Sequence, residues 1–203
     1  FALPHDKSWN TNAVNSTVVM DGEKVSLYED GWRTEEHRIW DHKSKTTFIA
    51  WAPYNQEVTY NHDKGICISS FDVLSDAPAP MFSYPVIDQS EPSLGKSVGI
   101  TFQHALAFVE IRAASEVLEG QVIIIKSASI NGLMSSGEFQ SSLEPYWIPG
   151  GTTTEFSFCK SDIELNFDSI SLGEARRMIP QTADIAVDLV IDVYDRDGNL
   201  IES

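Results

Sequence analysis

One residue suited to chemistry is a histidine inside an apolar stretch, ITFQHALAFVEI (residues 100–111). Apolar residues alternate there with smaller or polar ones, which predicts a strand with His104 on its apolar side. A lone histidine on such a face is usually a core residue that hydrogen-bonds a neighbour. Gln103 and Glu110 supply no nucleophile and base set, so we interpret His104 as structural, with a site assembled from distant segments as the alternative.

Metal-binding residue types occur in two further places. The stretch EEHRIWDH (residues 35–42) holds His37 and His42 among carboxylates, but the spacing matches no familiar metal motif and favours a solvated connection. The stretch DRDGN (residues 195–199) is similar to part of a calcium loop, but its glycine comes too early for an EF-hand, and a hairpin turn explains it. We therefore predict no catalytic residue, no metal ligand and no cofactor, and a protein that is not an enzyme.

Six aromatic residues form a third candidate group. Exposed together, they would make a platform on which sugar rings stack, whereas buried they would fill or cover a β-sandwich core, which is the commoner role. The six are Trp32, Trp40, Trp51, Trp147, Tyr54 and Tyr60. A carbohydrate-binding β-sandwich module therefore stays as the alternative function.

Composition excludes several classes of partner. The chain has 203 residues, 42% of them apolar, and a formal net charge of −16 at pH 7. The electrostatic field of so negative a chain repels the phosphates of nucleic acids and the headgroups of anionic lipids. We therefore expect neither nucleic acid nor a membrane surface as a partner. No apolar run approaches the roughly 20 residues of a membrane-spanning helix. Cys67 and Cys159 show no metal or redox spacing, and whether they pair is left open.

The remaining pattern is that of an antiparallel all-β protein. Short β-branched or aromatic runs alternate with turn signals, among them Asp30-Gly31, Asn131-Gly132 and Asp197-Gly198, which favour tight hairpin connections. On the face that holds His104, Phe102 is expected to be buried, and its replacement by alanine to cost about 3–5 kcal/mol. Polar and small residues interrupt the strand pattern before Gln121, which predicts two domains, residues 1–115 and 116–203.

Three short motifs of the chain, in this order and spacing, resemble the fimbrillin-like family of fimbrial subunits of Bacteroidales. They are FIAWAPY (residues 48–54), ITFQHALAFVEI (residues 100–111) and MIPQ (residues 178–181). A fourth stretch, DVLSDAPAP (residues 72–80), also resembles a segment between the family's first two motifs. The resemblance covers most of the chain, and it implies that the histidine of FQHAL belongs to a structural motif.

The resemblance also implies a fold, a location and partners. The implied fold is a tandem of transthyretin-like antiparallel β-sandwich domains. The implied location is a fimbria at the cell surface or outer membrane, reached by export as a lipoprotein precursor. The implied partners are other fimbrial subunits, joined by strand addition, with a host or bacterial surface protein or glycan as a further candidate. Whether the subunit belongs to the shaft, anchor or tip is left open.

One strand is predicted to serve assembly. Apolar residues alternate from position 185 to position 193, which predicts a strand that buries one complete face against the second domain's core. These residues are Ile185, Val187, Leu189, Ile191 and Val193. Little sequence follows them before Ser203, so we expect an incomplete or shortened second domain, with an exposed groove or open edge beside residues 185–194 that a neighbouring subunit's strand fills.

Overall fold

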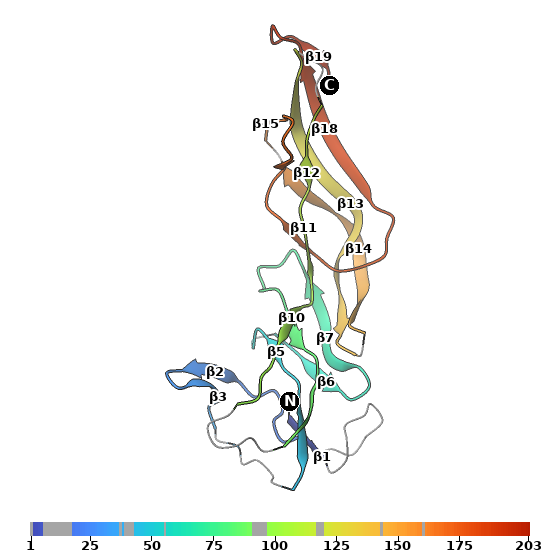
Figure 1. Cartoon of the computed structure of the whole chain (residues 1–203). Helices are drawn as coiled ribbons and strands as arrows, with labels where there is room; N and C mark the ends of the chain where they lie inside the picture. The colour runs from blue at the N-terminus through green and yellow to red at the C-terminus, as the bar shows by residue number, and fades with distance from the viewer. Residues whose placement is uncertain are drawn as a thin grey trace. The chain divides into compact units, whose positions relative to one another are not determined.

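The structure, a computed structural model, describes residues 2–5, 18–36, 38, 43–54, 56–90, 97–116, 120–142, 144–159 and 161–203. Within these ranges the regular elements are all β-strands, and the chain forms several antiparallel sheets (Figure 1). This confirms the all-β class that the turn and strand patterns predicted.

The chain forms two compact units, each built from separate stretches of sequence. Unit 1 comprises Phe1–Phe71, Ala77–Ala105 and Glu138–Ile148, and unit 2 comprises Asp72–Asp76, Leu106–Gly137 and Pro149–Ser203. Two long strands, β13 (Val122–Gln140) and β14 (Tyr146–Cys159), therefore contribute residues to both units. The division into domains 1–115 and 116–203 concerns independent folding, which compactness alone does not measure, so it stays a prediction.

Unit 1 contains two three-stranded sheets, with strand orders β1-β4-β9 and β10-β8-β5, and two hairpins, β2-β3 and β6-β7. β7 also pairs with β13, so the second hairpin belongs to the same seven-stranded sheet as β13, β18 (Ala186–Tyr194) and β19 (Leu200–Glu202). The strands of unit 1, apart from the ends of β13 and β14, are β1 (Ala2–His5), β2 (Val25–Tyr28), β3 (Gly31–Thr34), β4 (Lys45–Phe48), β5 (Trp51–Ala52), β6 (Thr59–Asn61), β7 (Gly65–Asp72), β8 (Met81–Ser83), β9 (Val86–Gln89) and β10 (Phe102–His104).

An aromatic cluster forms much of the core of unit 1. The ring of Phe139 lies 5.1 Å from the ring of Phe82 and 5.2 Å from that of Trp147, measured between centroids. Trp147 also approaches Phe71, and its indole N–H donates to the carbonyl of Ala105 at 2.6 Å. Burying these rings removes a large apolar area from water while the one polar group keeps a partner.

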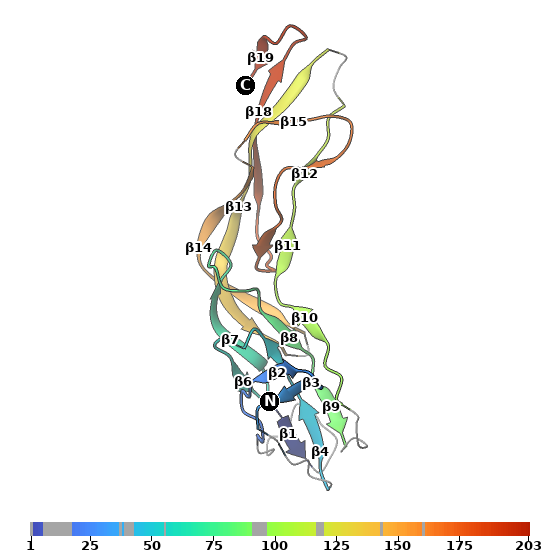
Figure 2. The same ribbon diagram turned by 90° about the vertical axis from the view of Figure 1, so that its left-hand side faces the viewer.

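Unit 2 has two layers of strands, which Figure 2 shows apart from each other: β13 with β18 in one layer, and β11 with β12 in the other. β13 pairs with β14, β15 and β18, β18 pairs with β19, β11 pairs with β17, and β12 pairs with β16. The further strands are β11 (Ala107–Val109), β12 (Arg112–Ala113), β15 (Ile163–Glu164), β16 (Ile170–Ser171), β17 (Arg176–Met178), β18 (Ala186–Tyr194) and β19 (Leu200–Glu202).

The stretch of residues 100–111 is not one continuous strand, contrary to expectation. It is interrupted at Ala105 and Leu106, between β10 and β11, so the alternation does not continue along a single face. β10 is the outer strand of its sheet, and His104 is exposed, as is 41% of Phe102. The expectation that both side chains are packed in the core was therefore wrong, because this strand lies at a sheet edge and the buried positions are those of the interruption.

Asn131-Gly132 was also assigned wrongly, since it lies inside β13 and not in a hairpin turn. Gly132 has a φ of 94°, and a side chain there would collide with the carbonyl oxygen of Asp184. Positive φ and close backbone approach are both properties for which glycine is used. Asp30-Gly31 and Asp197-Gly198, in contrast, do lie at hairpin connections, between β2 and β3 and between β18 and β19.

Candidate functional site

The strongest candidate site is the margin of unit 2 formed by β18. Its alternating sequence forms a strand that pairs along its length with β13, with Val187 opposite Ile130 and Leu189 opposite Ala128. On its other side β19 pairs only with Val193 and Tyr194. Along Ala186–Asp192, none of the described strands pairs with the outer edge of β18.

The apolar side chains of β18 are largely exposed. Ile185, Val187, Leu189 and Ile191 are exposed, with 48% for Leu189, and Val193 is half-buried. Their neighbours on the same face of β13 are buried: Ile125, Ala128 and Ile130. The expectation that β18 buries a complete face was therefore wrong. Alternation established which side chains share a face, but coverage of that face by another layer is a tertiary property.

An apolar groove lies on the same face. It encloses about 270 Å³ within unit 2. Its lining comes from both layers and from the segment that leads into β18: Ala107, Val109, Ile130, Leu133, Met178, Ile179, Pro180, Gln181, Ala183 and Ile185. Ile130 lies opposite Val187 in the β13-β18 ladder, and Ile185 directly precedes β18, so the groove adjoins the exposed apolar face of β18 and the two form one apolar surface. We call this surface the β18 edge.

A glutamine amide closes one end of the β18 edge. The backbone N–H of Met134 donates to Oε1 of Gln181 at 3.1 Å, and Nε2 of Gln181 donates to the carbonyls of Met134 at 3.0 Å and Ile179 at 3.2 Å. One side chain thus satisfies both backbone groups of Met134, where the described β13-β18 ladder has already ended. The MIPQ motif was recognised only as a family resemblance; the polar residue in an apolar context was the signal for this role.

The opposite face of β18 carries acidic residues. Asp188 accepts a hydrogen bond from the amide of Asn131 at 2.5 Å. Asp192 accepts one from the hydroxyl of Tyr194 at 3.2 Å, and this bond, followed by burial, raises the pKa of Tyr194. Nζ of Lys126 lies 3.8 Å from Asp192 and 2.6 Å from Asp162, and the bond to Asp162 is the main cause that raises the pKa of Lys126. The strand β18 is therefore apolar on one face, and its other face carries Asp188 and Asp192 with the exposed Val190 between them.

Neither of the two candidate metal-binding stretches of the sequence gives a metal site among the described residues. His37 and His42 lie outside the described residues. Asp195 accepts hydrogen bonds from the backbone and amide of Asn199 and from the backbone of Asp197, which close a hairpin turn, and the bond from the Asn199 side chain is the main cause that lowers the pKa of Asp195. Across the described part of the chain, no group of three or more His, Cys, Asp or Glu residues is placed to hold a metal ion.

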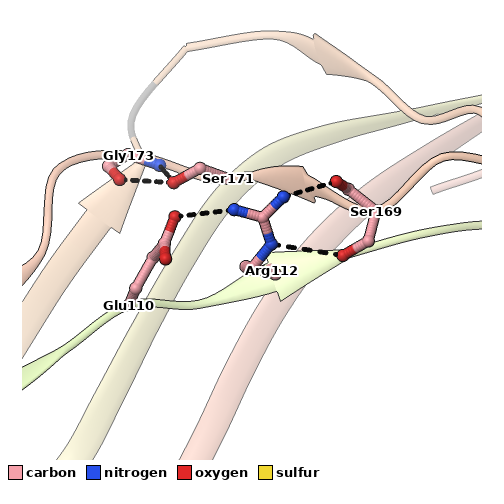
Figure 3. Close-up of polar contacts among 5 residues, drawn as sticks. All are labelled: Glu110, Arg112, Ser169, Ser171 and Gly173. Atoms are coloured by element: carbon pink, nitrogen blue, oxygen red, sulfur yellow. Dashed lines mark hydrogen bonds and ion pairs between the residues drawn. The ribbon is translucent and has the colours of Figure 1, made fainter.

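A polar cluster in unit 2 combines residue types found in active sites (Figure 3). The guanidinium of Arg112 donates to Glu110 at 3.1 Å and to the hydroxyl and carbonyl of Ser169 at 3.4 and 2.6 Å. The hydroxyl of Ser171 donates to the carbonyl of Gly173 at 2.6 Å. Hydrogen bonding from Ser171, ahead of the charge of Arg112, lowers the pKa of Glu110. These contacts join the two strands of the short pair β12-β16, and they engage both the carboxylate of Glu110 and the hydroxyl of Ser171.

The six aromatic residues do not form one platform. Trp147 is buried, Trp51 and Tyr60 are half-buried, and Tyr54 is exposed. Trp40 lies outside the described residues. Trp32, on the β2-β3 hairpin, has 71% of its surface exposed.

Two further features were left open by the sequence. Cys67 and Cys159 are free thiols, the first half-buried and the second buried, and burial raises the pKa of Cys67. The ranges that the structure describes contain no helix long and apolar enough to cross a membrane.

Comparison with known proteins gives one informative match. No family model matches the chain, and no curated protein does. The chain is similar to the crystal structure of a fimbrial protein from Bacteroides vulgatus ATCC 8482, with a TM-score of 0.72, 18% identity and coverage of 97% of this chain and 76% of that one. This chain therefore shares its all-β fold with a bacterial fimbrial protein, and the tandem transthyretin-like arrangement that the resemblance implied stays a prediction.

Proposed function

We propose that this chain is a non-enzymatic structural or adhesive subunit of a bacterial surface fimbria, and that it joins other subunits by accepting a strand at the β18 edge. The observation that carries the proposal is an open strand edge beside exposed apolar side chains, in a chain with the fold of a fimbrial protein. The tandem transthyretin-like arrangement, with domains 1–115 and 116–203, belongs to the same proposal.

The physical case rests on how proteins treat strand edges. Natural sheets protect exposed edges with lysine, proline, bulges or covering segments, because unpaired backbone groups recruit other strands. The outer edge of Ala186–Asp192 has neither lysine nor proline and no covering strand among those described. An added strand would pair with these backbone groups and cover Val187, Leu189 and Ile191, as in other cases of strand addition.

A charge placed on the apolar face tests the proposal. Leu189→Asp should abolish incorporation of the subunit into fimbriae, because it puts a carboxylate where an incoming strand must pack, and it should leave the subunit folded because Leu189 is already exposed. Leu74→Asp is the matched control, since Leu74 is exposed in unit 2 and belongs neither to β18 nor to the lining of the groove. Immunogold labelling of purified fimbriae measures incorporation. Equal incorporation of the two variants would refute assembly through the β18 edge.

The location follows from the same proposal. A fimbrial subunit must be exported and displayed at the cell surface, and export as a lipoprotein precursor is the route that the family resemblance implies. Surface proteolysis of intact producing cells, compared with lysed cells, tests this location. Protection of the chain in intact cells would contradict it.

One observation favours a second function, binding of carbohydrate. Trp32 lies directly opposite Leu27 in the β2-β3 hairpin, and both side chains are exposed. An exposed indole beside an exposed apolar neighbour suits stacking against a sugar ring. A glycan array probed with the chain and with its Trp32→Ala variant separates the two functions. Binding that depends on Trp32 would support carbohydrate recognition, and absence of any glycan binding would remove it.

A further inference from the structure

We propose that the strand accepted at the β18 edge comes from a polypeptide segment of different sequence, in which apolar residues alternate with other residues and basic residues stand four positions apart on the outer face. This inference rests on the proposed function, since it specifies the partner of the same site. It follows from the extent of the open edge, the chemistry of its two faces and the distribution of basic residues in this chain.

The open edge has defined limits. At its carboxyl end β19 pairs with Val193 and Tyr194, so an added strand must stop before these residues. At the other end, Gln181 already satisfies the backbone groups of Met134, and Gly132 packs against the backbone of Asp184. The backbone available for pairing is therefore Ala186–Asp192, which fits a strand of ordinary length.

The two faces of this window demand different side chains. Residues directly opposite each other on paired strands share a face, so positions opposite Val187, Leu189 and Ile191 lie over the apolar surface and must be apolar. Positions opposite Asp188 and Asp192 lie on the acidic face. Opposite charges in such cross-strand pairs are favourable and like charges unfavourable, so lysine or arginine is favoured at these two positions.

Of the two aspartates, Asp188 should contribute more than Asp192 to the preference for a basic residue. Its carboxylate is exposed and accepts a hydrogen bond from the neutral amide of Asn131. Asp192 is more shielded and already lies near the ammonium group of Lys126. Asp184 precedes Asp188 by four residues and is exposed, which extends the acidic face toward the entry of β18.

The 203 residues themselves offer no matching strand. Their 14 lysines and arginines include no pair separated by four positions, so no segment among them presents basic residues opposite both Asp188 and Asp192. The net charge of −16 also opposes close approach of two copies. The charge pattern therefore favours a different polypeptide over a second copy of these residues.

Synthetic strands test the inference with the whole chain. One peptide carries valines on the groove side and two lysines four positions apart on the outer side, and a second peptide carries glutamates in place of the lysines. At low ionic strength we expect the lysine peptide to bind about tenfold more tightly in fluorescence anisotropy, with a smaller difference at high salt. Asp188→Lys should reverse the preference, and Glu57→Lys, which makes the same charge change at an exposed residue of unit 1, should not.

The outcomes separate the inference from the proposed function. Equal binding of both peptides, or a preference that Asp188→Lys leaves unchanged, would overturn the charge rule while strand addition stands. Binding of both peptides that Leu189→Asp abolishes would place them at the β18 edge. Failure of both peptides to bind, or binding that Leu189→Asp does not weaken, would count against the proposed function itself.

Discussion

At the scale of single residues, Gln181 replaces a missing piece of backbone. Its amide has a donor and an acceptor in the geometry of a peptide group, which is why one side chain can satisfy the N–H and the carbonyl of Met134 together. Half-buried backbone groups left without a partner are costly, so this contact fixes the segment that precedes β18.

Gln181→Leu, which keeps most of the volume of the side chain and removes its polar atoms, should lower the free energy of unfolding by about 1–3 kcal/mol, because the backbone groups of Met134 lose their partner. Urea titration followed by tryptophan fluorescence measures the loss. Gln103→Leu, at an exposed position in β10, is the control and should be close to neutral. A similar small effect for both variants would show that the amide contact contributes nothing to stability.

A second residue makes stability depend on pH. Burial, and to a lesser extent the charge of Asp63, raises the pKa of Tyr60 from the ordinary value of 10.0 to about 12. The folded chain therefore holds this proton more tightly than the unfolded chain, and the stability it contributes is present below pH 10.0 and is lost as the pH rises toward about 12. Tyr60→Phe should flatten this alkaline loss in denaturant titrations, whereas Tyr54→Phe, at an exposed residue, should not. The same slope in all three proteins would contradict the raised pKa.

At the scale of elements, the sequence predicted strands better than it predicted what covers them. The run from Ala186 to Tyr194 is a strand because alternation is a local property of the backbone and its side chains. The exposure of Leu189 depends on the layers around β18, which no local pattern records. The sequence predicted an open edge beside residues 185–194, and assembly there stays a prediction. The closing role of Gln181 was not predicted, since it depends on a contact across 47 positions of sequence.

In the segment around His104, the strand itself was predicted wrongly. Apolar alternation predicted one buried strand there, yet the chain bends at Ala105 and passes from unit 1 to unit 2. The bend carries its own hydrogen bonds, from the N–H of Ala105 to Pro80 and from the indole of Trp147 to Ala105. Hydrogen bonds from distant residues to backbone groups help to decide where a strand ends, and the local sequence pattern does not reveal them.

Two phenylalanines of unit 1 test this account of its core. Phe139 is 2% exposed and packs against Phe82 and Trp147, so Phe139→Ala should cost about 3–5 kcal/mol by leaving a cavity. Phe102 is 41% exposed on an edge strand, so Phe102→Ala should cost less than about 1 kcal/mol, a correction of the value expected from sequence. Chemical unfolding of both variants makes the comparison. A larger loss for Phe102→Ala would restore the buried interpretation of its face.

At the scale of the whole molecule, net charge acts on every encounter between chains. Each copy carries a formal charge of −16, so two copies repel each other while a basic strand is attracted. The apolar face of β18 favours contact in both cases, and it does not distinguish the two partners. Ionic strength therefore separates contact between like copies from capture of a basic segment.

Salt should act in opposite directions on these two kinds of association. From about 0.01 M to about 1 M salt the Debye length falls from about 30 Å to about 3 Å, which removes most of the repulsion between copies and most of the attraction of a basic strand. We expect self-association, measured by sedimentation equilibrium, to strengthen severalfold over this range, and binding of the lysine peptide to weaken. Leu189→Asp should suppress self-association at high salt if the β18 edge is the surface involved, with Leu74→Asp as the control. Self-association that weakens as salt rises would show that charge attraction between copies, and not the exposed apolar face of β18, brings the chains together.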